Sequence, residues 1–423
     1  MISEKQFVAI DLGGSSIRAM AAEMQDNGAF KILSCESMDS DDVKCGIVEQ
    51  TAAPKISTLQ KYLQNSSKIT EISMVSVAVG ARTMKQIPVA VSRYIGKERI
   101  ITNQLLNEMK EECRNSFQHP NISIYDIIPT SFEVDGVRVF EPISKTGSQI
   151  VGNYNLIVGT TLIKDKQNSC FERTGLIVEH SPLAVEALSA VLLEDTDRED
   201  GCGLIDFGSS TTTFAAYWEG VLQYLMVVPL GANTITKDIE ELGVNATNAE
   251  KLKCKMGNAL ESMVENPVYV QIPSSIEGAV PVRISTQFLA TVIESRLEEI
   301  LHPIVDAISL LPFSLDAGIV ITGGGSKLNN IIDFIQSKTE IPTRYGNHTE
   351  WLSDDTDETF FDPSYARLIG TIVLTGDYRK NHPIEQTVSD PDKKPKLKKT
   401  GKIREKVSQG FLNFFSDENK MNS

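Results

Sequence analysis

The chain has 423 residues, which is enough for about two to four domains of ordinary size. Its apolar content of 41% and charged content of 23% are typical of a globular protein. The formal net charge is −15, which disfavours a nucleic-acid partner because phosphate binding requires basic side chains. The six cysteines are dispersed without a CxxC pair, which favours a reduced cytoplasmic protein over a disulfide scaffold or a zinc site.

The charge is distributed unevenly along the chain. Residues 391–406 contain eight basic and two acidic side chains, although the chain as a whole is acidic. A basic tail on an acidic body indicates a separate partner for the tail. The N-terminus runs directly into an apolar segment, so we expect no signal peptide. No stretch of about 18 apolar, uncharged residues predicts a transmembrane helix.

Apolar periodicity predicts strands that alternate with helices, and hence an α/β fold. Strands are expected at 7–12, 17–23, 72–80, in two runs within 122–142, and at 155–161, 204–207, 211–218 and 319–321. Helices are expected at 101–113 with Thr102 as N-cap, from Ser181-Pro182 to about 193, within 233–265, at 287–311 with a break or kink at Pro303, and at about 329–338. An acidic loop is expected at 194–200, a last apolar element at 365–375, and a solvated linker from about 378 to 400.

One motif occurs twice, 195 residues apart. Asp11 and Asp206 each end an apolar strand and begin an Asp-x-Gly-x-Ser turn that leads into a second strand. Glycines let backbone N–H groups approach phosphate oxygens, hydroxyls add donors, and the two aspartates could hold a hydrated Mg²⁺. One such turn alone is most often an ordinary tight turn. Two of them facing each other across a cleft would hold a triphosphate from opposite sides.

A third motif is the strand that enters a triple glycine in residues 318–326. A run of glycines leaves no side chain between the backbone and a flat ligand, so a purine and its ribose could lie there. Glycine after a strand is often only a turn. Together with the repeated motif, however, this segment favours a nucleotide site.

In this order, the three motifs resemble the two phosphate loops and the adenosine loop of the actin / heat-shock-chaperone / sugar-kinase superfamily. Within it, the chain resembles the FtsA family of bacterial cell-division proteins over essentially its whole length. Four segments carry this closer resemblance: the Ile-Ile-Pro, Val-Asp-Gly and Glu-Pro-Ile run within 127–147, the segment 229–253, the segment 362–370, and a terminal linker followed by an amphipathic stretch.

The resemblance implies a duplicated, two-lobed actin-like (ribonuclease-H-like) α/β fold with a nucleotide cleft. It also implies these subdomains: 1A at 1–83, 163–200 and 365–378; the FtsA-specific insert 1C at 84–162; 2A at 201–230 and 291–364; and 2B at 231–290. A flexible basic linker at 379–400 and an amphipathic membrane-targeting helix at 401–418 would follow.

The resemblance further implies that ATP and Mg²⁺ bind in the cleft. The residues carried over for ATP are Asp11, Gly13, Gly14, Ser15, Ser16, Arg18, Asp206, Gly208, Ser209, Ser210, Thr211, Gly231, Asn233, Glu250, Lys253, Gly323, Gly324, Gly325 and Ser326. Asp11 and Asp206 would hold Mg²⁺ through water.

The resemblance does not supply a catalytic base for ATP hydrolysis. Chaperone relatives place a Glu before the proline of the helix that is expected here at Pro182, whereas this chain has Ser181. A serine cannot act as a general base near neutral pH without help. Glu179 and His180 are the candidates to orient water. If neither does, ATPase activity is weak or absent, and ATP mainly sets conformation and polymerisation.

The C-terminal segment has the pattern of a helix that lies in a membrane interface. Its apolar face and basic shoulders comprise Ile403, Val407, Phe411, Leu412, Phe414 and Phe415, with Lys402, Arg404 and Lys406. Such a helix binds anionic lipid through buried apolar area and surface charge. The alternative is a terminal helix that packs on the core of the protein itself.

The resemblance implies that the protein anchors the FtsZ ring to the cytoplasmic face of the inner membrane at the division site. It would be a peripheral membrane protein that self-associates into filaments, in part through 84–162, and recruits later division proteins. Subdomain 231–290 would receive the FtsZ C-terminal tail, with Lys237, Arg283 and Arg296 as candidate contacts. Two alternatives stay open: an actin-like pilus-assembly scaffold, which should lack a lipid-binding tail, and a superfamily kinase, which should contain a catalytic Asp in a sugar pocket.

Overall fold

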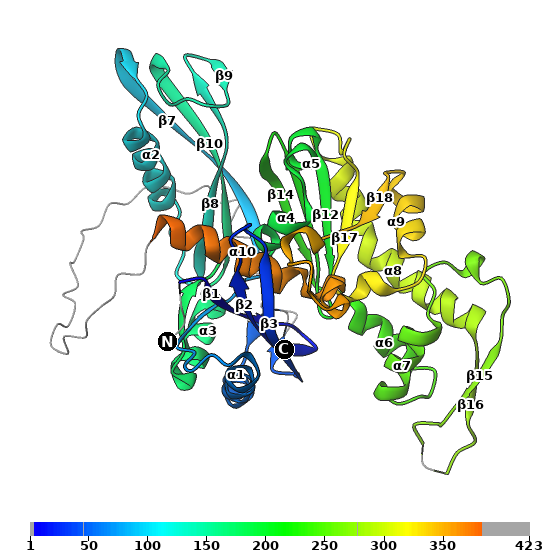
Figure 1. Ribbon diagram of the computed structural model, residues 1–423. Coiled ribbons are helices and arrows are strands. Elements are labelled where there is room, and N and C mark those ends of the chain that lie inside the picture. Colours follow the sequence, from blue (N-terminus) through cyan, green and yellow to red (C-terminus); the bar gives the residue numbers. More distant parts are fainter. Residues whose placement is uncertain (1–3, 45, 277, 383–423) are drawn as a thin grey trace. The chain divides into compact units, whose positions relative to one another are not determined.

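The computed structural model describes residues 4–44, 46–276 and 278–382 (Figure 1). Contacts divide the chain into one unit that ends at Asn381 and a second unit at 382–423. The predicted amphipathic helix at 401–418, and the predicted linker beyond residue 382, lie outside the described residues. Within the described ranges, no helix is both long and apolar enough to cross a membrane.

The N-terminal lobe is built on a five-stranded sheet with the order β11-β6-β1-β2-β3. Its strands are β1 (Gln6–Leu12), β2 (Ser16–Met24), β3 (Phe30–Asp39), β6 (Met74–Ser76) and β11 (Ile177–His180). β1 pairs antiparallel with β2 and parallel with β6. Helices α1 (Ala53–Ser67) and α3 (Leu162–Thr174) pack on one face, and a two-stranded ribbon of β4 (Val43–Lys44) and β5 (Ile47–Val48) lies beside them.

Residues 85–160 form a separate four-stranded antiparallel sheet with the order β7-β10-β8-β9. Its elements are β7 (Lys85–Ile100), α2 (Asn103–Ser116), β8 (Ile122–Val134), β9 (Val137–Val139) and β10 (Thr146–Thr160). Thr102 caps α2, as predicted, because its hydroxyl accepts a hydrogen bond from the Leu105 amide at 3.3 Å. We call this part the insert sheet. It has its own apolar core against α2.

The second lobe repeats the sheet of the first, with the order β14-β13-β12-β17-β18. The strands are β12 (Cys202–Phe207), β13 (Thr212–Trp218), β14 (Val221–Val228), β17 (Ile319–Thr322) and β18 (Thr343–Tyr345). Helices α6 (Ala232–Glu240), α7 (Ala246–Met256), α8 (Thr286–Ser309) and α9 (Ile331–Thr339) share a core with one face of this sheet. The hairpin of β15 (Tyr269–Ile272) and β16 (Val282–Ser285) extends from α7 and α8 (Figure 1).

Several predicted elements differ from those observed. The helix expected from Ser181 begins at Ala184 as α4 (Ala184–Leu192), because the Ser181 hydroxyl and the Pro182 carbonyl instead bond to the backbone at Val77 and Val79. The acidic loop at 194–200 is a short helix, α5 (Asp195–Asp200), capped by Asp197. Pro303 does not interrupt α8. The linker was predicted from 379, but α10 (Ala366–Asn381) includes residues 379–381.

The sequence pattern did not predict several other elements, including β3, β7, the N-terminal part of β10 before residue 155, α1, α3, β14 and β18. Short 3-10 turns complete the fold at η1 (Gln50–Ala52), η2 (Glu261–Met263), η3 (Gly324–Lys327), η4 (Thr349–Trp351), η5 (Glu358–Phe361) and η6 (Pro363–Tyr365).

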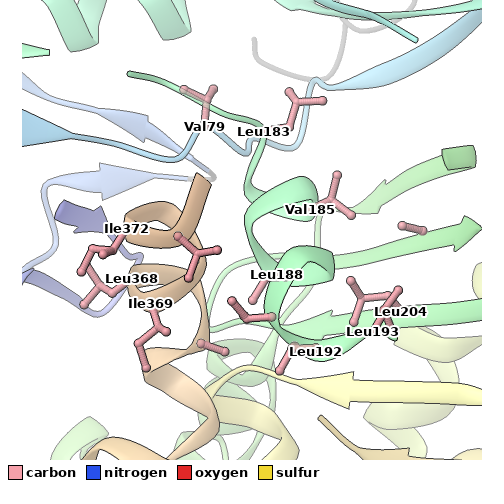
Figure 2. Packing of buried hydrophobic residues seen from close by; sticks show 14 of the residues in the cluster. Val79, Leu183, Val185, Leu188, Leu192, Leu193, Leu204, Leu368, Ile369 and Ile372 are labelled. Atoms are coloured by element: carbon pink, nitrogen blue, oxygen red, sulfur yellow. The ribbon is translucent and has the colours of Figure 1, made fainter. Parts of the chain in front are cut away.

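Helices α4 and α10 lie between the two five-stranded sheets. Alternate side chains of the two repeated strands pack into this shared core: Phe7 and Ala9 from β1, and Leu204 from β12. Figure 2 shows Leu188 and Leu192 of α4 beside Leu368, Ile369 and Ile372 of α10.

The two helices touch through their backbones. A Cβ placed on Gly370 would lie 1.8 Å from the carbonyl oxygen of Ala187, which is far inside any atomic contact. Only glycine therefore permits this approach. The contact brings α10 close enough to α4 for both helices to share one core with the two sheets.

The insert sheet is attached to α4 through two carboxylic acids. Glu186 of α4 lies against Asp126 of β8, and its carboxylate accepts a hydrogen bond from the Leu183 amide at 3.3 Å. Burial raises the pKa of Glu186 to about 8, and the neighbouring Asp126 charge and hydrogen bond act in the same direction. The folded protein therefore holds a proton at this contact near neutral pH.

This contact predicts that stability falls as pH rises. The folded form keeps the Glu186 proton up to about pH 8, whereas the unfolded form releases it near its ordinary value of 4.5. The free energy of unfolding should therefore decrease between these two values by about 1 kcal/mol or more. Glu186→Gln should remove this slope, because glutamine keeps the shape and cannot titrate. Urea unfolding of both proteins across this range measures the difference, and parallel curves would contradict the prediction.

Candidate functional site

A cavity of about 890 Å³ opens where the two repeated hairpins face each other. This volume is in the range of small-molecule sites. Most of the predicted ATP residues line it: Asp11, Gly13, Gly14, Ser15, Ser16, Arg18, Asp206, Gly208, Ser209, Ser210, Thr211, Asn233, Glu250, Lys253, Gly323, Gly324 and Gly325. The exceptions are Gly231 and Ser326, which do not line the cavity. We call this cavity the cleft.

The first two predicted phosphate loops meet across the cleft. A Cβ on Gly14 would lie 2.5 Å from the hydroxyl oxygen of Ser210 and 2.7 Å from that of Ser209. The turn between β12 and β13 is closed by the Gly208 amide, which donates to the Thr211 carbonyl at 3.0 Å. The bare backbone of one loop thus faces the hydroxyls of the other, which is the arrangement that anion binding requires.

The start of α6 packs against the second loop. The amide of Ala232 donates to the Gly208 carbonyl at 2.9 Å, and that of Asn233 donates to the Ser209 carbonyl at 2.8 Å. A Cβ on Gly231 would lie 2.6 Å from the Gly208 oxygen. Gly231 therefore packs against the second loop so closely that only glycine fits there.

The triple glycine forms the opposite wall. Gly323 has a φ of 88°, in the region that favours glycine, and η3 follows it. Gly324 is exposed, and no heavy atom lies within 4 Å of a Cβ built on it. Gly325 packs on the Phe207 ring. Ser326 is fully buried, and its hydroxyl donates to the Gly323 carbonyl at 2.7 Å, so its predicted contact with a ligand is corrected to a structural one.

Glu250, which is exposed, forms a polar group with the buried residues Lys253 and Thr236. The Lys253 ammonium donates to the Ala232 carbonyl at 3.0 Å, to the Thr236 hydroxyl at 2.8 Å and to Glu250 at 2.7 Å. Its three hydrogens therefore all have partners in the protein. Burial by itself raises the pKa of Glu250. The hydrogen bonds that Glu250 accepts from Lys253 and Thr236 have the larger combined effect, so its pKa lies below the ordinary value. The ionised Glu250 can still offer its cleft-facing side to a ligand.

Arg367 of α10 is a cleft residue that sequence reasoning missed. Its guanidinium donates to Asp11 Oδ1 at 3.2 Å and to Asp206 Oδ2 at 2.6 Å. Burial lowers its pKa and the two carboxylates raise it; the carboxylates prevail, so the pKa of Arg367 lies above the usual range. An arginine thus joins Asp11 and Asp206, the two residues predicted to hold Mg²⁺ through water.

Arg18 lines the cleft, and its position is fixed by the segment before α10. Its guanidinium donates to the Ser364 carbonyl at 2.8 Å and lies 5.1 Å from the centre of the Tyr365 ring. Ser364 also lines the cleft. Strand β2, which follows the first predicted phosphate loop, is therefore joined at the cleft wall to the segment just before α10.

The two candidate catalytic residues do not line the cleft. Glu179 forms a two-point ion pair with Arg379 of α10, at 2.6 and 2.9 Å, and both side chains are only 8% exposed. His180 stacks on Tyr378, with ring centres 4.5 Å apart, and its Nδ1 lies 3.3 Å from the Thr375 hydroxyl. Both side chains instead join β11 to α10, which favours the alternative that neither of them orients water.

The three candidate contacts for an acidic tail differ in their surroundings. Arg296 is bound by Asp238 at 2.6 and 2.7 Å and also pairs with Glu299, so an acidic tail would compete with these carboxylates for its guanidinium. Lys237 lines the cleft. Arg283 is exposed on β16 and lies 4.0 Å from the centre of the Tyr269 ring.

The Glu179–Arg379 contact predicts a structural role for both residues. Arg379→Met should lower the free energy of unfolding by about 3–5 kcal/mol, because it leaves a buried carboxylate without a partner. Adding Glu179→Gln should recover part of this loss, since no unpaired charge remains. Lys380→Ala, in the exposed pair with Asp377, is the matched control and should change stability by less than about 1 kcal/mol. Denaturant unfolding measures all three; an equal effect at positions 379 and 380 would contradict the prediction.

Comparisons with known proteins agree with this architecture. A family model described as "Cell division protein FtsA" matches residues 203–370. The chain is 26% identical to the "Cell division protein FtsA" of Borreliella burgdorferi over 421 residues, 97% of this chain and 99% of that protein. It is 24% identical to the protein of the same name from Neisseria meningitidis over 388 residues, 89% of this chain and 92% of the relative.

Solved structures establish the fold. A PilM-PilN type IV pilus biogenesis complex aligns with a TM-score of 0.65 at 14% identity, over 88% of this chain and 98% of that chain. MreB5 of Spiroplasma citri bound to ADP aligns with a TM-score of 0.56 at 13% identity, over 90% of this chain and 100% of that chain. The fold is therefore actin-like, and the chain is similar over nearly its whole length to the FtsA cell-division proteins, which confirms the resemblance predicted from its sequence.

Proposed function

We propose that the chain is an actin-like cell-division protein that binds an adenine nucleotide, ATP in its active form, in the cleft. One observation carries the proposal. The two Asp-x-Gly-x-Ser hairpins and an open glycine loop surround one cavity of about 890 Å³. Hydroxyls and bare backbone suit phosphates, and the open surface at Gly324 suits a flat base. The similar MreB5 structure, which is bound to ADP, supports this use of the fold.

Gly324 offers a test that separates binding from folding. A methyl group at this position meets no protein atom, so Gly324→Ala should leave the melting temperature unchanged. It should weaken binding of ATP and ADP by about tenfold or more if the nucleotide lies on this loop, because a misplaced methyl group costs at least that much in a fitted site. Calorimetric titration with each nucleotide measures the effect.

Gly325→Ala is the matched contrast within the same loop. Its Cβ would lie 2.6 Å from atoms of the Phe207 ring, so this variant should lose stability. Wild-type affinity in a stable Gly324→Ala protein would place the nucleotide elsewhere and reject this part of the proposal.

The wider role that we propose rests on the similarity to FtsA proteins. The protein would attach the FtsZ ring to the cytoplasmic face of the cell membrane through the segment 401–418, bind the FtsZ tail near residues 231–290, and self-associate into filaments. Recruitment of later division proteins would follow. Lys237, Arg283 and Arg296 are the candidate contacts for an acidic tail, and Lys237 and Arg283 are exposed. Hydrolysis would be slow or absent, since neither Glu179 nor His180 lines the cleft.

Membrane attachment predicts a difference between the full chain and one that ends at Asn381. Truncation there keeps α10 complete, whereas a cut at Tyr378 would remove the buried Arg379. The full chain should sediment with anionic vesicles, less so at high salt, and the shortened chain should not. Neutral vesicles serve as the control. If neither chain sediments, membrane attachment by 401–418 is rejected and the pilus-scaffold alternative gains weight.

A further inference from the structure

The cleft contains a protein cation at the place where the fold would otherwise call for a metal. Asp11 and Asp206 end the two repeated strands β1 and β12, and their carboxylates are only 12% and 10% exposed. One guanidinium joins them, with Nη1 on Asp11 and Nη2 on Asp206. Two enclosed carboxylates with no cation between them would repel each other, so this arginine offsets one of their two charges and reduces that repulsion.

A hydrated Mg²⁺ would have to share these carboxylates with Arg367. Mg²⁺ requires a nearly octahedral set of oxygen ligands and keeps several of its waters, so it needs free carboxylate oxygens and room. Oδ1 of Asp11 and Oδ2 of Asp206 accept hydrogen bonds from Arg367, so one oxygen of each carboxylate is engaged by the arginine.

Arg367 is held in place by the same helix packing that joins the lobes. It lies between the buried residues Ala366 and Leu368, and its carbonyl accepts a hydrogen bond from the Thr371 hydroxyl at 2.7 Å. Gly370, three residues later, makes the backbone contact with α4. The guanidinium therefore projects from a rigid element towards the junction of both hairpins, and it lines the cleft.

We propose that Arg367 is a built-in counter-ion of the cleft, and that the protein binds the phosphates of a nucleoside di- or triphosphate without needing Mg²⁺. This inference deepens the proposed nucleotide function and rests on it. Arginine is suited to the task because its planar fork can satisfy two oxyanions at once and stays charged at every physiological pH. Any metal would arrive on the nucleotide and would not be held by Asp11 and Asp206.

Calorimetric titration of the full chain with ADP and ATP, in excess Mg²⁺ and in excess EDTA, tests the proposal. Wild-type affinity should differ by less than about threefold between the two conditions. Arg367→Gln frees both carboxylates, so its affinity should become metal-dependent and fall by about tenfold or more in EDTA relative to Mg²⁺. Arg344→Gln, which removes a half-exposed arginine paired with Asp197, is the matched control and should behave as wild type.

A second readout does not depend on nucleotide. Mn²⁺ binding to the nucleotide-free protein, followed by the relaxation of water protons, should reveal no tight site in wild type. A new site should appear in Arg367→Gln and should disappear again when Asp206→Asn is added. Arg367→Lys keeps a positive charge at this place and should gain no Mn²⁺ site, which provides a stable comparison if the glutamine variant unfolds.

The outcomes separate the two proposals. A loss of wild-type nucleotide affinity of about tenfold or more in EDTA overturns the counter-ion proposal, as does a tight wild-type Mn²⁺ site that Asp206→Asn removes. If wild type binds neither nucleotide in either condition, the proposed nucleotide function fails. The Mn²⁺ measurement then still decides whether Arg367 excludes a metal from the two aspartates.

Discussion

The close contact of α4 and α10 at Ala187 and Gly370 is the constraint on which the rest of the structure depends. Because no side chain separates the two backbones there, both helices fit between the sheets and share one core with them. The same approach places Arg367, three residues before Gly370 on α10, where it reaches the ends of β1 and β12 at once. The joining of the lobes and the charge balance of the cleft therefore have a common origin.

The parts of the site that could be predicted from sequence are those whose geometry is local. A strand that ends in Asp-x-Gly-x-Ser determines its own turn, and two copies of it in one chain predict a facing pair. The Thr102 cap followed from the same kind of local pattern. The ends of helices and strands that depend on distant contacts could not be predicted from the local sequence. The start of α4 moved from Ser181 to Ala184 because the chain at 181–182 pairs with the backbone near β6.

The charges that neutralise one another across the fold could not be predicted. Arg367 is 356 residues from Asp11, and Arg379 is 200 residues from Glu179, so no spacing within the sequence connects either pair. Glu179 was a reasonable candidate base by its position before the helix, yet its partner turns it into a structural group. Gly370 was the one available signal, because a glycine inside an apolar helical segment often marks a close backbone approach.

Helix α10 runs from the cleft to residue 381, near the end of the described residues. Arg367 is its second residue and Asn381 is its last, so the two are separated by about 21 Å of continuous helix. Near the end of this helix, Arg379 donates a hydrogen bond to the Gln6 carbonyl of β1 and pairs with Glu179 of β11. Arg367 and Arg379 thus fix the two ends of one helix, the first at the ends of β1 and β12 and the second at β1 and β11.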